Sequence, residues 1–422
     1  MILKKYKSKE PLMYYGTNER VILPPYKKAP KVRGIWVSNV ANIDTPVMKD
    51  VTSYKEYLIK LVERIASYNM NLIIFQVRPC CDAYYKSNIN PWSRFITGEE
   101  GKDPGFDVLE FVINEAKKYN IEVHAWMNPY RVGMKSLDDL NMTKEEFLNT
   151  LAENNYARCH PEDTILDGTK KVILKPSSPS VIKYVTESIM EVVNNYDVTG
   201  VHIDDYFYPY AKVPEELEQE DYKHDQEVRT SSNTPLLSFD DWRRENVNKM
   251  IKSIHDELKK SFSKTNRKVV FGISPFAIYR TNKALKETGW EKGSFHSAGA
   301  LECYSDLYSD VYHWMKEGYI DYVVPQVYFS FERVDVNYHD LTAWWAKICE
   351  ETNTTLYIGH GLYQMGSNDV WANPNEMKNQ LRFNEMYKRI DGSIFFTYRD
   401  LVEGQNPVKD EAIKILKECL NK

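Results

Sequence analysis

Two consecutive carboxylates in the middle of the chain are the residues with the clearest chemical potential. The stretch V-T-G-V-H-I-D-D-Y-F-Y-P-Y, residues 198–210, holds a short β-prone run, Val201–Ile203, followed at once by Asp204 and Asp205. Three aromatic residues then precede a proline. An ionised carboxylate can attack or stabilise an oxocarbenium-like centre, and aromatic rings offer flat faces to a sugar. The alternative is a solvated strand end, where Asp commonly begins a turn.

The spacing within this stretch assigns its side chains to two faces. Because side chains alternate along a strand, His202 shares a face with Asp204, whereas Asp205 shares the opposite face with Ile203. A polar or cationic neighbour two positions before a carboxylate helps to keep it ionised. Bringing both carboxyl groups into one site would require a bend or a bulge.

The elements around these residues alternate strongly between strands and helices. Eight mostly apolar strands are predicted, and each is followed by a helix: Val32–Asn39, Asn71–Pro79, Glu122–Tyr130, a fourth around Val201–Ile203, Val269–Phe276, Ile320–Tyr328, Thr355–Tyr363 and Gly392–Asp400. This alternation implies parallel strands, and eight such units imply a closed (β/α)₈ barrel. An open doubly wound sheet is the rival, but N-V-A-N-I-D-T-P after the first strand is no glycine-rich phosphate loop.

The connections after the third, fourth and fifth strands are long. They cover residues 131–180, with a helical segment over Lys144–Asn154 and a hairpin turned at Gly168, and then residues 207–240 and 277–304. Residues 1–31 read as an N-terminal arm that lies on the domain or is partly disordered, and 32–422 as a single (β/α)₈ domain.

In such a barrel, chemistry takes place at the carboxyl ends of the strands. Polar side chains gather at these predicted ends, and they supply forked donors, hydroxyl groups and aromatic faces. Trp126 could instead belong to the core, and Gln76 or Gln326 could instead only satisfy backbone groups. Trp92 is a further residue that could stack on sugar. The residues expected to bind substrate are Gln76, Arg78, Trp126, Asn128, Tyr130, His202, Tyr206, Ser274, Gln326, Tyr328 and Tyr398.

Several long motifs together resemble one known family. They are V-R-G-I-W-V-S-N-V-A-N-I-D, F-Q-V-R-P, P-W-S-R-F-I-T-G, E-V-H-A-W-M-N-P-Y-R-V, G-V-H-I-D-D-Y-F-Y-P, W-R-R-E-N-V-N, F-G-I-S-P-F and D-Y-V-V-P-Q-V-Y. Over residues 32–400 the chain is similar to the glycosyl hydrolase-like 10 family, formerly a domain of unknown function, which includes a divisome-associated hydrolase of denuded peptidoglycan glycans. The resemblance implies a barrel related to α-amylase-like glycosidases, a cell-wall glycan substrate and a catalytic Asp at the end of strand four. Asp204 matches that position, and His202 takes the place of the basic residue two positions earlier.

The second carboxyl group that glycoside hydrolysis needs is less clear in the sequence. Strand five ends in S-P-F and offers no Glu where an amylase-like enzyme carries one. We place Asp205 and Glu332 in the catalytic set with Asp204; the other candidates for the acid are Asp82, Glu302 and Asp400. If the substrate carries an N-acetyl group, that group can replace the nucleophile, and Asp204 would orient it or act as the acid.

Two further classes of function stay open. One is a barrel that binds glycan without cleaving it, since no acid is obvious. The other is a metal-dependent hydrolase or deacetylase with Asp204, Asp205, His124 and His202 as ligands, although no H-x-H or H-x-x-x-H pair occurs. The six cysteines form no C-x-x-C pattern, and we expect neither a metal nor another cofactor.

Composition limits the classes of partner and the location that are expected for the protein. The net charge of −5 and the lack of a basic block argue against nucleic acid, and no stretch reaches about 20 apolar residues, as a membrane span requires. The N-terminus M-I-L-K-K-Y-K-S-K-E has no apolar signal region, and scattered thiols fit a reducing compartment, so a cytoplasmic location is expected. Export to the envelope with the signal removed is the alternative, and the oligomeric state cannot be read from the sequence.

Overall fold

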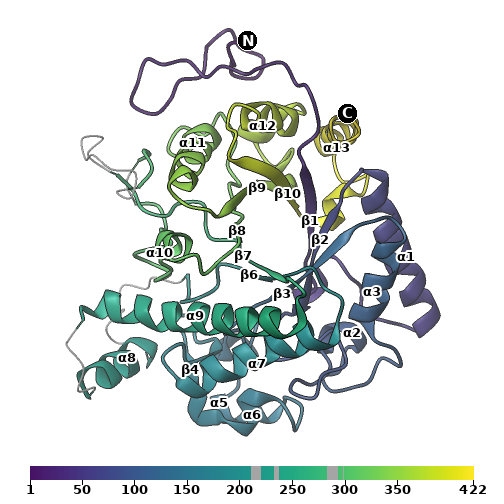
Figure 1. The fold of residues 1–422 in the computed structure, drawn as a ribbon, viewed down its shortest axis with the longest axis vertical. Helices are drawn as coiled ribbons and strands as arrows, with labels where there is room; N and C mark the ends of the chain where they lie inside the picture. The colour runs from purple at the N-terminus through teal and green to yellow at the C-terminus, as the bar shows by residue number, and fades with distance from the viewer. Residues whose placement is uncertain (211–219, 232–236, 283–292, 298) are drawn as a thin grey trace.

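The protein folds as a closed barrel of eight parallel strands (Figure 1), described here from a computed structural model. The described residues are 1–210, 220–231, 237–282, 293–297 and 299–422. Around the barrel the strands follow the order β1-β10-β9-β8-β7-β6-β3-β2. They are β1 (Val32–Val37), β2 (Leu72–Arg78), β3 (Glu122–Met127), β6 (Gly200–Ile203), β7 (Val270–Ile273), β8 (Tyr322–Val323), β9 (Thr355–Gly361) and β10 (Ile390–Phe396). The predicted (β/α)₈ barrel is confirmed.

A helix follows each barrel strand and returns the chain to the opposite end (Figure 1). This arrangement lets every strand pair in parallel with its neighbours, which only a crossover connection permits. The helices are, in order, α1 (Val51–Ser67), α3 (Val108–Lys117), α7 (Pro179–Asn195), α9 (Phe239–Thr265), α10 (Val311–Lys316), α11 (Tyr338–Ile348), α12 (Glu376–Asn384) and α13 (Pro407–Leu420).

Long insertions follow β3, β6 and β7, as predicted. The first carries α4 (Leu137–Leu140), α5 (Lys144–Asn149), α6 (Tyr156–Cys159) and the antiparallel hairpin of β4 (Thr164–Leu166) and β5 (Val172–Leu174). The insertion after β6 contains a helix that the sequence did not predict, α8 (Glu220–Ser231). Parts of the loops expected over 207–240 and 277–304 lie outside the described residues.

Two elements are short, for local reasons. The sixth barrel strand has only two ladder residues because Pro325 has no N–H to donate, although Gln326 still bridges to Phe276 and Gly359 on its two sides. The helix that follows β7 begins only at Val311, where the side chain of Asp310 caps it by accepting from the His313 N–H.

Apolar residues pack in two places. A large cluster fills the space between strands and helices, and a smaller one inside the barrel includes Trp36, Ile74 and Trp126. Tyr322 also reaches into the barrel, and a Cβ on Gly272 would lie 1.9 Å from its ring. Gly272 therefore leaves the room that this tyrosine occupies.

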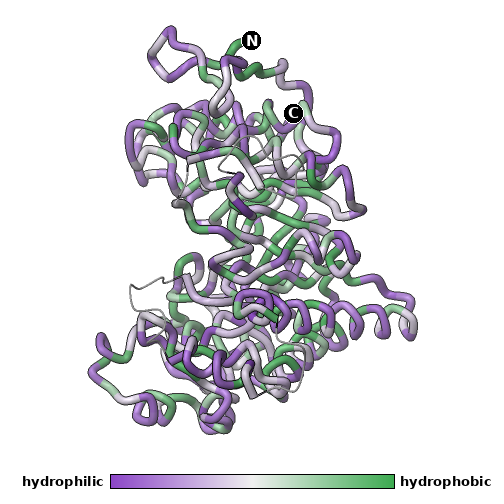
Figure 2. Tube along the Cα trace, turned by 90° about the vertical axis from the view of Figure 1, so that its left-hand side faces the viewer, coloured by the Kyte–Doolittle hydropathy of each residue, from purple (hydrophilic) through white to green (hydrophobic). Residues whose placement is uncertain are grey.

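Residues 1–31 lie on the outer side of the helices that surround the barrel, beside α11 and α12 and at the top of both views (Figures 1 and 2). The segment makes antiparallel bridges within itself, such as Ile2 with Ile22, and buries Leu3, Leu12, Val21 and Leu23. It is fixed to the barrel helices by polar contacts: the Tyr15 N–H donates to Asp340 at 3.0 Å, and Arg382 donates to the carbonyl of Pro24 at 2.7 Å.

No helix in the described part of the chain combines the length and the apolar character that crossing a membrane would need.

Candidate active site

A cavity of about 790 Å³ opens at the carboxyl ends of the strands. This size is typical of pockets that bind small molecules or segments of a polymer. Its lining includes many of the residues that were predicted for the site: Gln76, Trp126, Asp204, Asp205, Tyr206, Ser274, Gln326 and Tyr328. We refer to it as the main cavity.

Asp204 is buried and held by three donors from different elements. The Trp126 indole N–H donates to Oδ2 at 3.0 Å, the Asn128 amide lies 3.2 Å from both carboxylate oxygens, and the Tyr206 N–H lies 3.3 Å from Oδ1. Burial raises the pKa of Asp204, and the charge of Arg131 and these hydrogen bonds oppose the rise. The carboxylate is therefore fixed in one orientation at the cavity wall.

Asn128 is itself held firmly. Its Oδ1 accepts from the backbone N–H groups of Tyr130, at 3.2 Å, and Arg131, at 2.8 Å, so its amide N–H₂ must point toward Asp204. The turn that follows β3 thus sets the orientation of a side chain that reaches across to the end of β6.

Asp205 lines the same cavity but has a different environment. Tyr210 donates its hydroxyl to this carboxyl group, and Gln326 hydrogen bonds to it while also donating to the Ser274 carbonyl at 2.8 Å. Burial, and then the negative charge of Asp204, raise the pKa of Asp205 to about 7. Near neutral pH this carboxyl group can therefore hold a proton.

Both carboxyl groups reach one cavity because the strand ends before them. β6 stops at Ile203, and the Phe207 N–H then bonds to the Asp205 carbonyl at 3.0 Å, which closes a tight turn. The alternation of a strand no longer applies beyond Ile203. The bend that the sequence argument required is thus present.

Gln76 contributes an unused donor to the cavity. Its Oε1 accepts from the N–H groups of Asn39, at 2.9 Å, and Val40, at 2.8 Å, whereas its buried Nε2 has no partner among the described residues. A buried donor without a partner costs about 1–3 kcal/mol, so a ligand acceptor would be favoured there.

His202 lies beneath the cavity rather than on its wall. Its Nδ1 contacts the Tyr322 hydroxyl at 3.0 Å and its Nε2 contacts the Ser274 hydroxyl at 2.8 Å, while His124 contacts the same tyrosine at 2.8 Å. Burial lowers the pKa of His202 well below its usual value, so the ring is neutral. The positive charge expected beside Asp204 comes instead from Arg131.

Three predicted residues lie elsewhere. Arg78 is fully buried behind the strands, where it donates to the Asn128 carbonyl at 2.6 Å and lies over the Tyr184 ring of α7. Glu332 accepts from the Tyr6 N–H of the N-terminal segment at 2.6 Å, and buried Tyr398 is not part of the cavity wall. Arg78 thus supports the turn that holds Asn128.

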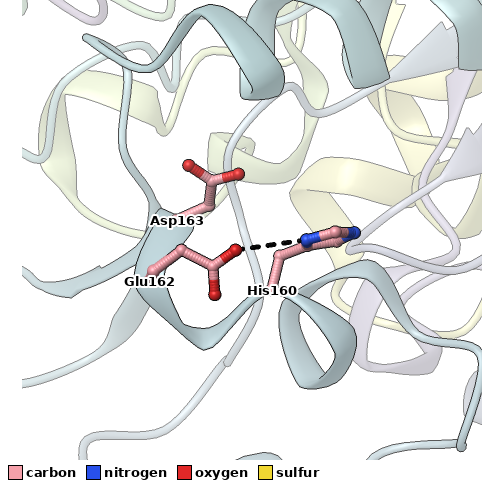
Figure 3. Close-up of side chains that lie close together, drawn as sticks. All are labelled: His160, Glu162 and Asp163. Atoms are coloured by element: carbon pink, nitrogen blue, oxygen red, sulfur yellow. Dashed lines mark hydrogen bonds and ion pairs between the residues drawn. The ribbon is translucent and has the colours of Figure 1, made fainter.

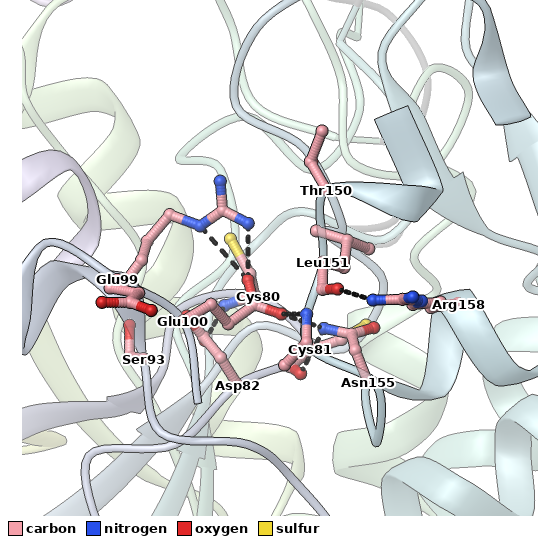
Figure 4. A network of polar contacts seen from close by, with 12 residues as sticks. Cys80, Cys81, Asp82, Ser93, Glu99, Glu100, Thr150, Leu151, Asn155 and Arg158 are labelled. Carbon is pink, nitrogen blue, oxygen red and sulfur yellow. Dashed lines mark hydrogen bonds and ion pairs between the residues drawn. The ribbon is translucent and has the colours of Figure 1, made fainter. Parts of the chain in front are cut away.

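The other candidates for the acid are engaged outside the main cavity. Asp400 pairs with Lys409 at 2.6 Å, and Glu302 accepts from Ser305 at 2.6 Å. Asp82 belongs to a polar network that joins the loop after β2 to the insertion after β3 (Figure 4), and there it accepts from the Cys80 N–H at 2.9 Å. In that network Asn155 bonds both Glu100 and the Cys81 carbonyl. Of the proposed acids, only Asp205 lines the cavity.

The structure adds residues that the sequence argument did not select. Arg131 comes immediately after Tyr130 in the motif N-P-Y-R, which also contains Asn128. Its guanidinium lies 4.5 Å from the centre of the Tyr206 ring. Other such residues in the cavity wall are Trp36, Tyr210, Phe276, Tyr363 and Phe396. Arg131, Tyr210, Trp36 and Phe276 lie within motifs quoted above, but nothing in the sequence separates the aromatic residues of the wall from core positions.

The ligands of a metal hydrolase are not brought together. His124 and His202 bond to Tyr322 and do not join Asp204 and Asp205. Among the described residues, the one group with three suitable ligand atoms within 4.8 Å of each other is His160, Glu162 and Asp163 (Figure 3), which lie in the insertion after β3 and do not line the main cavity. There Asp163 already accepts from three hydroxyl groups, those of Tyr156, Ser178 and Ser180.

Comparison with solved structures first defines the class of fold. The chain resembles α-L-fucosidase isoenzyme 2 from Paenibacillus thiaminolyticus (TM-score 0.52, 11% identity), covering 92% of this chain and 49% of the fucosidase, so this chain spans about half its length. It also resembles the catalytic domain of β-amylase from Paenibacillus polymyxa (TM-score 0.53, 10% identity), covering 93% and 98% of the two chains. At these identities the likeness shows the barrel fold that these glycosidases share.

Sequence comparison then identifies the family. The model of the glycosyl hydrolase-like 10 family matches residues 31–376, and the chain belongs to this family. It is 36% identical over 388 residues to glycosyl hydrolase YngK of Bacillus subtilis (strain 168), covering 90% of this chain and 70% of that protein. It is 30% identical over 404 residues to glycosyl hydrolase DigH of Escherichia coli (strain K12), covering 90% and 87%.

Proposed function

We propose that this protein is a glycoside hydrolase that cleaves a bacterial glycan, with Asp204 as nucleophile or stabiliser and Asp205 as general acid. The observation that carries the proposal is the presence of two carboxyl groups in one cavity with different environments. Glycosidases commonly separate the two roles in this way, since one carboxyl group must stay ionised and the other must hold a proton.

Asp204 fits the ionised role. Its donors are neutral N–H groups of Trp126, Asn128 and the Tyr206 backbone, and Arg131 contributes a positive charge without forming an ion pair with it. The carboxylate is thus stabilised and aimed but not neutralised by a direct contact. If an N-acetyl group of the substrate attacks instead, Asp204 would orient that group or act as the acid.

Asp205 fits the protonated role, because its pKa of about 7 lies close to the pH at which a general acid works best. A carboxyl group with an ordinary pKa would be almost wholly ionised at neutral pH. Gln326 and Tyr210 hold it in place.

For the substrate we propose amino-sugar strands of the peptidoglycan type. The support is the family membership together with a wall that offers aromatic faces, the unused Gln76 amide N–H and the Ser274 hydroxyl. Such a wall suits a neutral sugar ring with acyl and hydroxyl substituents.

The test is digestion of peptide-free glycan strands by the wild-type protein and by Asp204→Asn, with products identified by mass spectrometry. Shorter oligosaccharides from the wild type alone, with binding retained in Asp204→Asn, are expected. Binding by both proteins without cleavage by either would favour the glycan-binding alternative. Loss of wild-type activity on exhaustive chelation would instead favour a metal-dependent hydrolase.

A further inference from the structure

A second cavity, of about 320 Å³, lies directly beside the main cavity. We refer to it as the side cavity. The turn after β3, the β4–β5 hairpin and the loop after β6 form its walls. Four residues line both cavities, namely Arg131, Met134, Tyr206 and Tyr210. A polymer that passes the carboxyl pair in the main cavity can therefore continue into the side cavity past the stacked Arg131 and Tyr206.

Tyr130 presents an unused donor in this cavity. The residue is 2% exposed, and its hydroxyl group has no hydrogen-bond partner among the described residues. Its neighbour Asn128, by contrast, has both ends of its amide engaged. A buried hydroxyl without a partner costs about 1–3 kcal/mol, which a ligand acceptor would recover.

Two cationic side chains line the same cavity. The guanidinium of Arg131 lies over Tyr206 and donates one hydrogen bond, to the Pro79 carbonyl at 3.1 Å, and forms no ion pair within the described residues. Lys171, on the hairpin, forms no ion pair with any described residue either. Neither charge is therefore neutralised by a direct contact with a described carboxylate, although Arg131 also acts on Asp204 from a distance.

Among the described residues, Asp167 is the one acidic residue in the wall, and it is committed to its own turn. Its Oδ1 accepts from the Thr169 N–H at 2.8 Å, the Thr169 hydroxyl at 2.7 Å and the Lys171 N–H at 3.0 Å. The polar character of the side cavity is therefore dominated by donors and positive charge. This favours an acceptor, and most strongly a carboxylate.

We propose that the side cavity is a subsite for a neighbouring sugar unit that carries a carboxylate substituent, bound by Tyr130, Arg131 and Lys171. This inference rests on the proposed function, since the unit belongs to the same glycan that the main cavity would cleave. The subsite contributes binding next to the scissile bond and thereby selects acidic glycans.

The test compares peptide-free peptidoglycan strands with the same strands after chemical reduction of their carboxyl groups to alcohols. The wild type should show kcat/KM about tenfold higher for the carboxylate form, in line with a charge-assisted hydrogen bond. In Lys171→Gln and in Tyr130→Phe this preference should fall toward unity, through a rise in KM for the carboxylate form. Because the Tyr130 hydroxyl has no hydrogen-bond partner among the described residues, Tyr130→Phe should not lower the unfolding temperature.

Lys170→Gln is the matched control. It removes the same charge from the adjacent residue, which is exposed and pairs with Asp138 outside the side cavity. This variant should keep the full preference. A wild type without preference, or an equal loss of preference in Lys170→Gln, would overturn the subsite.

A binding measurement separates this inference from the proposed function. Affinity for both forms of the strands is measured in Asp204→Asn and in the double variant Asp204→Asn with Lys171→Gln. A preference for the carboxylate form that the second substitution removes supports the subsite even if the wild type cleaves nothing. Equal binding of the two forms overturns the subsite even if the wild type cleaves both.

Discussion

Asp204 and Asp205 are adjacent in sequence and line the same cavity, yet their carboxyl groups have different partners. Asp204 is bound by neutral N–H donors from β3 and the turn after it, whereas Asp205 is bound by Tyr210 and Gln326. The charge of Asp204 is one cause of the raised pKa of Asp205. The pair is therefore coupled, and protonating one member favours ionisation of the other.

This coupling predicts the pH dependence of the rate. If Asp205 is the acid, kcat/KM should fall as the pH rises through about 7, where the carboxyl group loses its proton. Asp205→Asn should lower the rate on a natural glycan by about 10²–10⁴-fold and remove this limb of the profile. On an aryl glycoside with a good leaving group, which needs little protonation, the loss should be much smaller.

Asp82→Asn is the control for that profile. Asp82 is also buried, and burial together with Glu100 raises its pKa to about 6, but it lies outside the cavity in the network of Figure 4. Its replacement should leave the limb near pH 7 in place. Retention of the limb in Asp205→Asn would contradict the assignment of the acid.

The carboxyl group of Asp205 should destabilise the folded protein at high pH. Its folded-state pKa of about 7 lies above the ordinary value of 3.8, so the folded protein holds this proton more tightly than the unfolded chain. Its contribution to stability is therefore full below about pH 4 and is lost as the pH rises toward and through 7. Asp205→Asn should raise the free energy of unfolding by a few kcal/mol near pH 8, since one pKa unit is worth about 1.4 kcal/mol.

Denaturant unfolding at about pH 4 and about pH 8 measures this difference. The gain from Asp205→Asn should be large at the higher pH and small at the lower one. An equal gain in the free energy of unfolding at both pH values would mean that the folded protein does not hold the Asp205 proton more tightly than the unfolded chain. The expected gain also illustrates the usual conflict between stability and activity at catalytic groups.

Arg243 on α9 should be important for stability. It is 1% exposed, pairs with Asp221 at 3.2 Å and Asp225 at 2.9 Å on α8, and lies 4.5 Å from the Tyr208 ring of the loop after β6. Arg243→Met leaves two buried carboxylates without their cation and should cost about 3–5 kcal/mol in urea unfolding. Arg333→Met breaks the exposed pair with Asp335 and should cost less than about 1 kcal/mol. Similar losses in the two variants would refute this view of the buried pair.

The contacts of Arg243 also explain why α8 was not predicted. The buried residues of this helix are the acidic Asp221 and Asp225, so its sequence lacks the apolar periodicity that indicates an amphipathic helix. The barrel itself was predictable because strand and helix periods alternate eight times, and most of the rim was predictable because strand ends gather there.

The residues that were predicted for the site but lie away from the main cavity do so for related physical reasons. Gln76 and Arg78 were both expected to bind substrate, but the register with β3 shifts between them, and Arg78 turns to the helices. Glu332 is held by Tyr6, 326 positions away, a contact that no local pattern indicates. A one-residue shift in register or a distant contact decides which side of the wall a side chain reaches.

The interior of the barrel offers a last prediction. Tyr322 places its hydroxyl between His124 and His202, and its ring occupies the space that a Cβ on Gly272 would enter, at 1.9 Å. Because the ring is held by both histidines, it cannot move away, and Gly272→Ala should destabilise the protein by about 3 kcal/mol or more. Gly34→Ala in β1 is the matched control, since its new Cβ would clash with the flexible end of Ile394, at 2.5 Å, and would lie at contact distance, 3.4 Å, from Leu72. Thermal and urea unfolding of the two variants measure the difference, and combining Gly272→Ala with Tyr322→Ala should cost less than the sum of the single changes. Equal costs for the two glycine variants, or strict additivity, would show that the ring of Tyr322 is not the obstacle.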